Sequence, residues 1–315
     1  MIDRIDIYTQ ALNAAFINSF SAIAEPAPIE PAITVVQSKG RIERYPWMYP
    51  PPLLHAWKGY RQYAKLGETD YRVPNVTYTA EFEALYEDLE DDQVGGFKLQ
   101  AAAMAKGAKE WMGIQSLINL AAGQTTTCFD GSNFFASSHN VGSGNNIVTG
   151  TASSGDNVTH AMVVLSLRNK MVKPLLWQQR EGPDFKSDAG SIESQKSRLV
   201  KWWSDLRGAA AFGFWFDAIL VKWASTPTVA DVQTTLGNVN ARFRTFTYPK
   251  NLTSDPNQYI HGQTVFAEDN TLIVCSTLIE HIVRQALTLS LISTSENWFK
   301  GWAKLICSGY LDSVV

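Results

Sequence analysis

The stretch GFKLQAAAMAKGAKEWMGIQSLINLAAG, residues 96–123, decides the fold because apolar side chains recur along it every three or four positions. This spacing predicts one amphipathic helix over 97–121, about 38 Å long, which can serve as the backbone of a flat molecule. Gly123 stands where a helix cap is expected. The acidic run EDLEDD, residues 87–92, precedes the helix, where carboxylates favour the positive end of its dipole.

Upstream of this helix the chain has little core of its own. Residues 5–23 have helical spacing, and the prolines between 26 and 31 then predict an extended arm. A helix on such an arm is expected to dock on another surface, a second subunit among the candidates. From 41 to 92 the sequence predicts extended pieces around the turn YPWMYPPPLL, a helix over 53–66 and a strand-like segment over 71–82.

Downstream of the long helix, strands and helices alternate without an internal repeat. Residues 142–155, GSGNNIVTGTASSG, predict a flexible surface loop. Strands are expected at 162–167, 173–179 and 212–220, and helices at 192–206, 229–243 and 277–287. The last helix is expected to begin on a capping box of Thr277 and Glu280. The mixture indicates the α+β class.

Composition excludes several classes of protein. The 315 residues carry a net charge of −3 and no basic tail, which argues against a nucleic-acid-binding protein. Cys128, Cys275 and Cys307 are odd in number and widely spaced, which argues against a secreted disulfide framework. No signal peptide or membrane span is recognisable, so we expect a soluble intracellular protein. The ten tryptophans suit either a large aromatic core or an interface.

A search for catalytic and metal motifs finds none of the common ones, so we expect no enzyme, no cofactor and no metal. Two places come nearest. Cys128, Ser132 and His139 bring together a nucleophile and a base, but the intervening Asp-Gly-Ser-Asn favours a β-turn. The acidic run lacks the alternating ligands and central glycine of a calcium loop.

Seven blocks of sequence, in order, resemble the Mu-like prophage major head subunits, which are capsid proteins of tailed phages. The blocks are RIERYPWMYPPPLLHAWKGYR (41–61), YRVPNVTYTAEFEALYEDLEDDQVG (71–95), CFDGSNFFASSH (128–139), KPLLWQQREGPDF (173–185), AFGFWFDAILVKW (211–223), LIVCSTLIEH (272–281) and NWFKGWAKLICSGYL (297–311). The chain departs from the family where His139 is followed by Asn140 instead of proline, and where 247–262 resembles an added loop.

The resemblance implies the Hong Kong 97-type capsid fold. It assigns an N-terminal arm to 1–40, an E-loop that reaches over a neighbour to 41–92, a peripheral domain to 93–225 and an axial domain to 226–315. The long helix would be the spine of the peripheral domain. The implied function is self-assembly into the icosahedral head shell that encloses the phage genome, in the virion and after assembly in the host bacterial cytoplasm.

The expected partners follow from that function. They are other copies of the chain in hexamers and pentamers, a separate scaffolding protein, a portal and possible decoration proteins, with DNA contacted non-specifically and no membrane. Inter-subunit anchors are expected at Trp47, Trp57 and Tyr71, with Arg61 against a neighbour's Glu87, Asp88 or Asp91. Two alternatives stay open: an encapsulin-like nanocompartment, and a hydrolase that uses Cys128 or Ser132 with His139.

Overall fold

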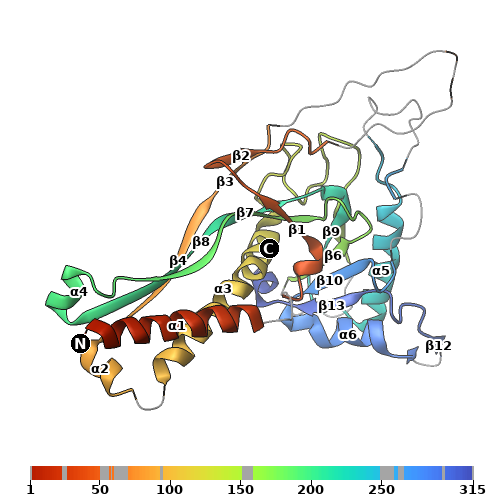
Figure 1. Cartoon of the computed structure of the whole chain (residues 1–315). Helices are drawn as coiled ribbons and strands as arrows, with labels where there is room; N and C mark the ends of the chain where they lie inside the picture. The colour runs from red at the N-terminus through yellow and green to blue at the C-terminus, as the bar shows by residue number, and fades with distance from the viewer. Residues whose placement is uncertain are drawn as a thin grey trace.

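The computed structural model describes residues 2–22, 27–49, 57, 59, 70–92, 95–150, 159–248, 259–261, 266–292 and 295–313. They form an elongated molecule with two larger β-sheets and two two-stranded ones (Figure 1). A four-stranded sheet extends to one side with the two longest helices against it, and a five-stranded sheet forms the broader end with shorter helices around it. Among the described residues, no helix is both long and apolar enough to cross a bilayer.

The long helix is present where it was predicted, as α3 (Gly96–Ala121). The carboxylate of Asp92 accepts hydrogen bonds from the backbone N–H groups of Gly96 and Phe97 at 2.9 and 3.3 Å, so the acidic run does supply its capping group. Gly123 does not act as the predicted cap, because it lies inside a 3-10 turn, η2 (Ala122–Gln124). A Cβ there would lie 2.6 Å from the Phe135 ring, so close packing is what requires the glycine.

The N-terminal helix α1 (Ile2–Ala22) docks within its own chain, against α3 and the strand β7 (Leu175–Ser187). Leu12 and Phe16 are buried in this contact, and the Phe16 ring stacks on Phe185 with centroids 5.0 Å apart. Another subunit is therefore not needed to cover the apolar stripe of α1, contrary to one reading of the sequence.

The four-stranded sheet has the order β1-β7-β8-β4. Its members are β1 (Ile33–Gln37), β7, β8 (Leu199–Phe212) and β4 (Val76–Leu85), with β1 parallel to β7 and the other pairs antiparallel. The hairpin of β7 and β8 projects far from the body and carries α4 (Ile192–Ser197) at its tip (Figure 1).

The helix predicted over 192–206 is wrong beyond residue 197. Arg198 adopts a left-handed backbone, φ 55°, which ends α4, and the following residues form β8. Burial along β8 largely alternates, as a strand requires, because pairing with β4 and β7 covers its backbone and its inner face. Long-range pairing overrides local helical spacing here.

The five-stranded sheet has the order β13-β10-β6-β9-β5. Its members are β13 (Lys304–Cys307), β10 (Thr271–Cys275), β6 (His160–Ser166), β9 (Ala218–Trp223) and β5 (Ile147–Thr149). The domain boundary expected at 225/226 runs through this sheet, since β6 and β9 precede it and β10 and β13 follow it.

Two further predictions need correction around this sheet. Residues 147–149 of the predicted surface loop form β5, an edge strand parallel to β9. The strand predicted over 212–220 is broken, since β8 ends at 212 and a 3-10 turn, η3 (Trp215–Asp217), leads into β9. Gly213 permits the crossing between sheets, because a Cβ there would lie 2.0 Å from the carbonyl oxygen of Lys173.

Among the helices of the broader end, α5 (Val229–Phe243) matches its predicted bounds and begins on a capping box of Thr228 and Asp231. The helix predicted over 277–287 consists of η4 (Thr277–Ile279) and α6 (Glu280–Thr288). Its predicted capping box is absent: the Thr277 side chain donates to Asp312, and Glu280 pairs with Arg284.

The segment before α3, residues 41–92 (the excursion), contains three described elements besides β4. The strands β2 (Ile42–Arg44) and β3 (Arg72–Pro74) pair antiparallel, and α2 (Tyr86–Glu90) follows β4. The strand-like segment predicted over 71–82 is confirmed as β3 and β4. The helix predicted over 53–66 lies outside the described residues, apart from two isolated positions. The remaining short elements are η1 (Glu30–Ala32), β11 (Leu291–Ile292), β12 (Ser295–Glu296) and η5 (Gly309–Ser313).

Candidate assembly surface and the buried Asp130 network

Two of the three predicted aromatic anchors are open to solvent. Trp57 is 68% exposed and Trp47 is 50% exposed. The Trp47 ring meets the buried Tyr45 edge-on, with centroids 5.8 Å apart, so its position is set by the core at the base of the excursion. Exposed indoles of this size are typical of surfaces that another molecule covers.

The third predicted anchor, Tyr71, has a role inside the chain. Its hydroxyl oxygen accepts a hydrogen bond from the backbone N–H of Phe212, the last residue of β8, at 3.1 Å. Burial raises the pKa of Tyr71 to about 12. The ring thus joins the excursion to the four-stranded sheet and leaves limited surface for a neighbour.

The predicted acidic contact residues lie on and just after α2. Glu87, Asp88 and Asp91 are all exposed. Glu87 pairs with Arg198, which follows α4, at 2.9 Å. Within the part of the chain that the structure describes, the carboxylates of Asp88 and Asp91 form no ion pair. Their predicted partner, Arg61, lies outside the described residues.

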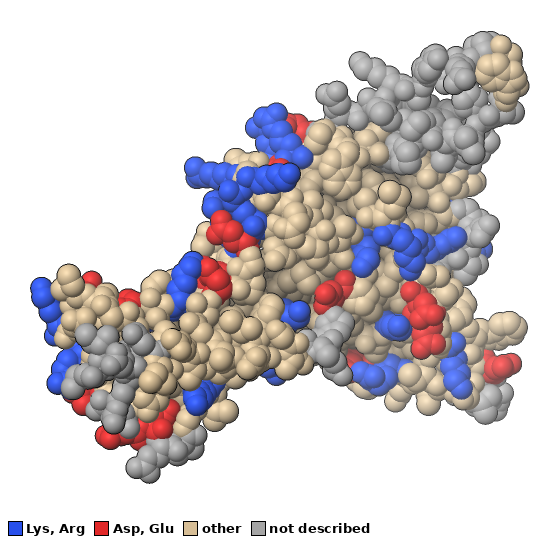
Figure 2. All heavy atoms as spheres, viewed as in Figure 1, with Lys and Arg blue, Asp and Glu red and all other residues tan. Residues whose placement is uncertain are grey.

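Basic side chains gather at a different place, over the β2–β3 hairpin (Figure 2). Lys39, Arg41, Arg44 and Arg72 are exposed there. Asp70 contacts two of them, with its carboxylate 3.7 Å from Arg44 and 2.5 Å from Arg72. The hairpin keeps an excess of positive charge, while α2 and the residues after it are acidic, so two copies can present opposite charges to each other.

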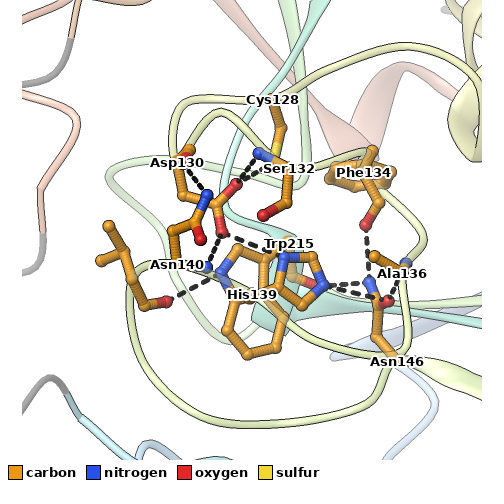
Figure 3. A network of polar contacts seen from close by, with 10 residues as sticks. Cys128, Asp130, Ser132, Phe134, Ala136, His139, Asn140, Asn146 and Trp215 are labelled. Atoms are coloured by element: carbon orange, nitrogen blue, oxygen red, sulfur yellow. Dashed lines mark hydrogen bonds and ion pairs between the residues drawn. The ribbon is translucent and has the colours of Figure 1, made fainter.

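The residues of the hypothetical hydrolase site, Cys128, Ser132 and His139, lie close together, with Trp215 beside them (Figure 3). Thr127 pairs with Asn133, and Gly131 takes a positive φ of 79° in the turn between them, as the Asp-Gly-Ser-Asn pattern predicts. Asp130 points back into this turn and is buried. Its carboxylate accepts hydrogen bonds from the backbone N–H groups of Ser132 at 2.9 Å and Asn140 at 3.0 Å.

This arrangement does not support nucleophilic catalysis. The Cys128 thiol lies 3.1 Å from Asp130 Oδ1, and its pKa is raised by burial and then by the neighbouring carboxylate. A reactive cysteine needs the opposite, a lowered pKa beside a cation. His139 Nδ1 faces Asp130 at 3.1 Å, and no hydrogen bond from the His139 ring to Cys128 or Ser132 is found.

Sequence reasoning missed two residues that complete this network. Trp215 stacks face to face on the His139 ring, with centroids 3.8 Å apart, and Asn146 contacts His139 Nε2 at 3.2 Å. Asn146 belongs to a stretch that its composition assigns to a mobile loop, yet it is fully buried. No pattern in the sequence connects positions 139, 146 and 215, because folding alone brings them together.

Comparison with known proteins supplies the identity. The family described as Mu-like prophage major head subunit gpT matches residues 5–311. The chain is 27% identical over 224 residues to the major capsid protein of Escherichia phage Mu, covering 68% of this chain and 73% of that protein. It is 28% identical over 207 residues to the Mu-like prophage FluMu major head subunit of Haemophilus influenzae, covering 62% and 67%.

The fold agrees with solved phage capsids. The bacteriophage JBD30 capsid superimposes with a TM-score of 0.72 at 16% identity, covering 92% of this chain and 93% of that one. The JBD30 procapsid gives 0.73 at 20% identity, covering 96% and 98%. The resemblance inferred from the seven blocks is confirmed, and neither the nanocompartment nor the hydrolase reading is needed. This chain belongs to the Mu-like prophage major head subunit gpT family, and it is a capsid protein of the phage head shell, not an enzyme.

Proposed function

We propose that this chain closes into an icosahedral shell of hexamers and pentamers around the phage genome, and that residues 41–92 carry contacts between neighbouring copies. The observation that supports the contact surface is the exposure of Trp47 and Trp57 on one excursion. Burial of a large apolar side chain stabilises a contact by about 1.5–3 kcal/mol, and a closed shell repeats each contact many times.

The domain organisation is part of the proposal. The arm would comprise 1–40, the E-loop 41–92, the peripheral domain 93–225 and the axial domain 226–315 of a Hong Kong 97-type subunit. The four-stranded sheet with α3 supports the peripheral assignment. The five-stranded sheet takes strands from both sides of residue 225, so β5, β6 and β9 would be an exception: they precede this boundary in the sequence but would pack with the axial domain.

Charge complementarity supports one set of contacts in particular. Arg61 and the basic β2–β3 hairpin of one copy would meet Asp88 and Asp91 of a neighbour. Glu87 contributes less in this arrangement, because Arg198 of the same chain already neutralises it. Exposed ion pairs are individually weak, about 0.2–1 kcal/mol, so their main effect is on orientation and register.

Partners other than further copies also belong to the proposal. A separate scaffolding protein and a portal would take part in assembly, and a decoration protein could bind the finished shell. The structural relative from JBD30 supports the last of these, because its capsid is described as decorated with minor capsid protein trimers. DNA would be contacted non-specifically, consistent with the net charge of −3.

The contact surface can be tested with Trp57→Ala. We expect a loss of about 2 kcal/mol per contact, the scale of an interface hot spot, and hence a large fall in the yield of shells from cells that express all the head genes. The free energy of unfolding of the unassembled chain, measured by thermal denaturation, should change by less than about 0.5 kcal/mol, because the side chain is exposed.

Trp298→Ala is the matched control, because Trp298 is 80% exposed and lies outside 41–92. It should leave the yield of shells near that of the natural chain. A yield that falls in proportion to thermal stability for Trp57→Ala, or falls equally for both variants, would remove the support for this contact surface.

A further inference from the structure

The side-chain amide of Asn146 has only one orientation that fits its surroundings. Its nitrogen donates hydrogen bonds to the carbonyl oxygens of Phe134 at 2.7 Å and Trp215 at 3.3 Å. Its oxygen accepts from the backbone N–H of Ala136 at 2.9 Å. Exchanging the oxygen and nitrogen would set acceptor against acceptor and donor against donor, so the assignment is fixed by the backbone.

The orientation of Asn146 determines one proton on His139. Nε2 of the imidazole lies 3.2 Å from Asn146 Oδ1, which can only accept (Figure 3). Nε2 must therefore carry a hydrogen. A neutral imidazole with its hydrogen on Nε2 has a bare lone pair on Nδ1.

That second nitrogen also faces an acceptor. His139 Nδ1 lies 3.1 Å from Asp130 Oδ2, and both side chains are 0% exposed. A bare lone pair against a buried carboxylate would be strongly repulsive, so a proton must lie between the two atoms.

The proton belongs to the imidazole and not to Asp130. Oδ2 of Asp130 also accepts from the backbone N–H of Asn140, and Oδ1 accepts from the N–H of Ser132 and from the Cys128 thiol. These donors favour the ionised carboxylate. Burial alone would raise the pKa of Asp130, but the hydrogen bonds from His139, Cys128 and Ser132 outweigh it, and the pKa is lowered.

We propose that the folded chain holds His139 as a buried imidazolium, clamped between the Asp130 carboxylate and the Asn146 carbonyl and stacked on the indole of Trp215. The near-parallel stack, 1° between ring planes with centroids 3.8 Å apart, places the cation over an aromatic face, which favours it. The site is a proton-binding site built from three separate parts of the chain.

A metal ion is the competing occupant. Cys128, Asp130 and His139 place their ligand atoms within 4.8 Å of one another, a donor set that zinc accepts. Each Asp130 oxygen already accepts one backbone N–H, from Ser132 or Asn140, and among the described residues only three ligands stand together where a structural zinc site has four. The geometry therefore favours the proton.

The clamp lies in the segment 127–146, which is bonded to the turn after α3 on one side and to the five-stranded sheet on the other. On one side Phe135 N–H donates to the carbonyl of Gly123, at the end of α3, and on the other Asn146 O accepts from Leu220 N–H in β9. Asp130 is in direct contact with the ring, and Cys128 contacts the other oxygen of Asp130.

The protonation state can be read directly from the ¹⁵N shifts of the histidine rings. We would record magic-angle-spinning spectra of the sedimented full chain, labelled in its imidazole nitrogens, at pH 7.5. We expect the signal of a ring with both nitrogens protonated, and this signal should be absent in His139→Gln. In Asp130→Asn the doubly protonated signal should also be lost, because the carboxylate that balances the charge of the imidazolium is gone.

Two outcomes would overturn the proposal. One is a neutral His139 ring in the natural chain at pH 7.5. The other is a stoichiometric metal content by mass spectrometry, lost in His139→Gln, which would assign the site to the ion. Where a variant does not fold, the His139 signal can be identified in the natural chain by its through-space contact with the Trp215 ring.

Discussion

At the scale of single residues, the surroundings of a side chain decide its chemistry more than its type does. Cys128, Ser132 and His139 have the composition of a catalytic site, yet the thiol is buried and its pKa is raised. The carboxylate oxygens of Asp130 bind the backbone N–H of Ser132 in the turn and the imidazole of His139. The same residues that suggest a nucleophile and a base in the sequence thus hold a hairpin closed in the structure.

We expect thiol-directed reagents to distinguish these roles. At pH 8 the folded chain should leave Cys128 and Cys275 unmodified, because burial raises the pKa of Cys275 to about 12 and that of Cys128 further. Cys307 is half-buried, with its pKa raised to about 11, and should react slowly. The reactive form is the thiolate, which becomes scarcer as the pKa rises.

Intact-mass spectrometry would count the labels against time. The control is the same chain in denaturant, where all three cysteines should react at the rate of a free thiol. Fast modification of Cys128 in the folded chain would show that the hairpin opens or that the thiol is activated.

At the scale of elements, the spacing of apolar residues predicts the amphipathic helices. It fails where pairing with a distant strand determines the secondary structure. The apolar spacing of α3 and α5 is visible in the sequence, and both helices lie within a residue of their predicted bounds. β8 carries a helical spacing of side chains in its first half but becomes a strand, because β4 and β7 flank it on both sides. β5 consists of three residues within a glycine- and serine-rich stretch. They form a strand because they pair with β9 at the edge of the sheet.

We expect substitution by alanine to change the free energy of unfolding in opposite directions at two glycines, Gly213 and Gly237. At Gly213, where the chain crosses between the sheets, a Cβ would meet the Lys173 carbonyl, so we expect Gly213→Ala to lower the free energy of unfolding by roughly 1–3 kcal/mol or more. At Gly237, inside α5, a Cβ would meet nothing within 4 Å, so Gly237→Ala should raise it by roughly 0.5–1 kcal/mol.

Denaturant unfolding of the unassembled chain, followed by circular dichroism, measures both changes. The pair serves as its own control, since each variant adds one methyl group. Equal effects of the same sign would mean that the crossing at Gly213 relaxes at little cost.

At the scale of the whole molecule, charge is distributed unevenly: basic over the β2–β3 hairpin and acidic on and after α2. Among the described residues, the ion pairs at these surfaces are local: Asp70 pairs with Arg44 and Arg72, and Glu87 pairs with Arg198. A shell places many copies side by side, where such opposite charges can select one register over others.

We expect charge reversal to lower shell assembly and a matched second reversal to restore it. Arg61→Glu alone, or Asp88→Arg with Asp91→Arg, should reduce the yield of shells, because each places like charges at the contact. The combined variant should recover much of the yield, as judged by electron microscopy of particles from cells that express all the head genes. No recovery would show that Arg61 and the α2 carboxylates do not meet.

The sequence by itself determined the family, the α+β class, the spine-like helix and the turn at Asp130, because ordered motifs, helical periodicity and turn chemistry are local properties. Only the tertiary structure decided that α1 docks on its own chain, that β5 and β8 are strands, and that His139 meets Asp130, Asn146 and Trp215. Those outcomes depend on contacts between residues far apart in the chain, whose free energy is gained only when both partners are already in place.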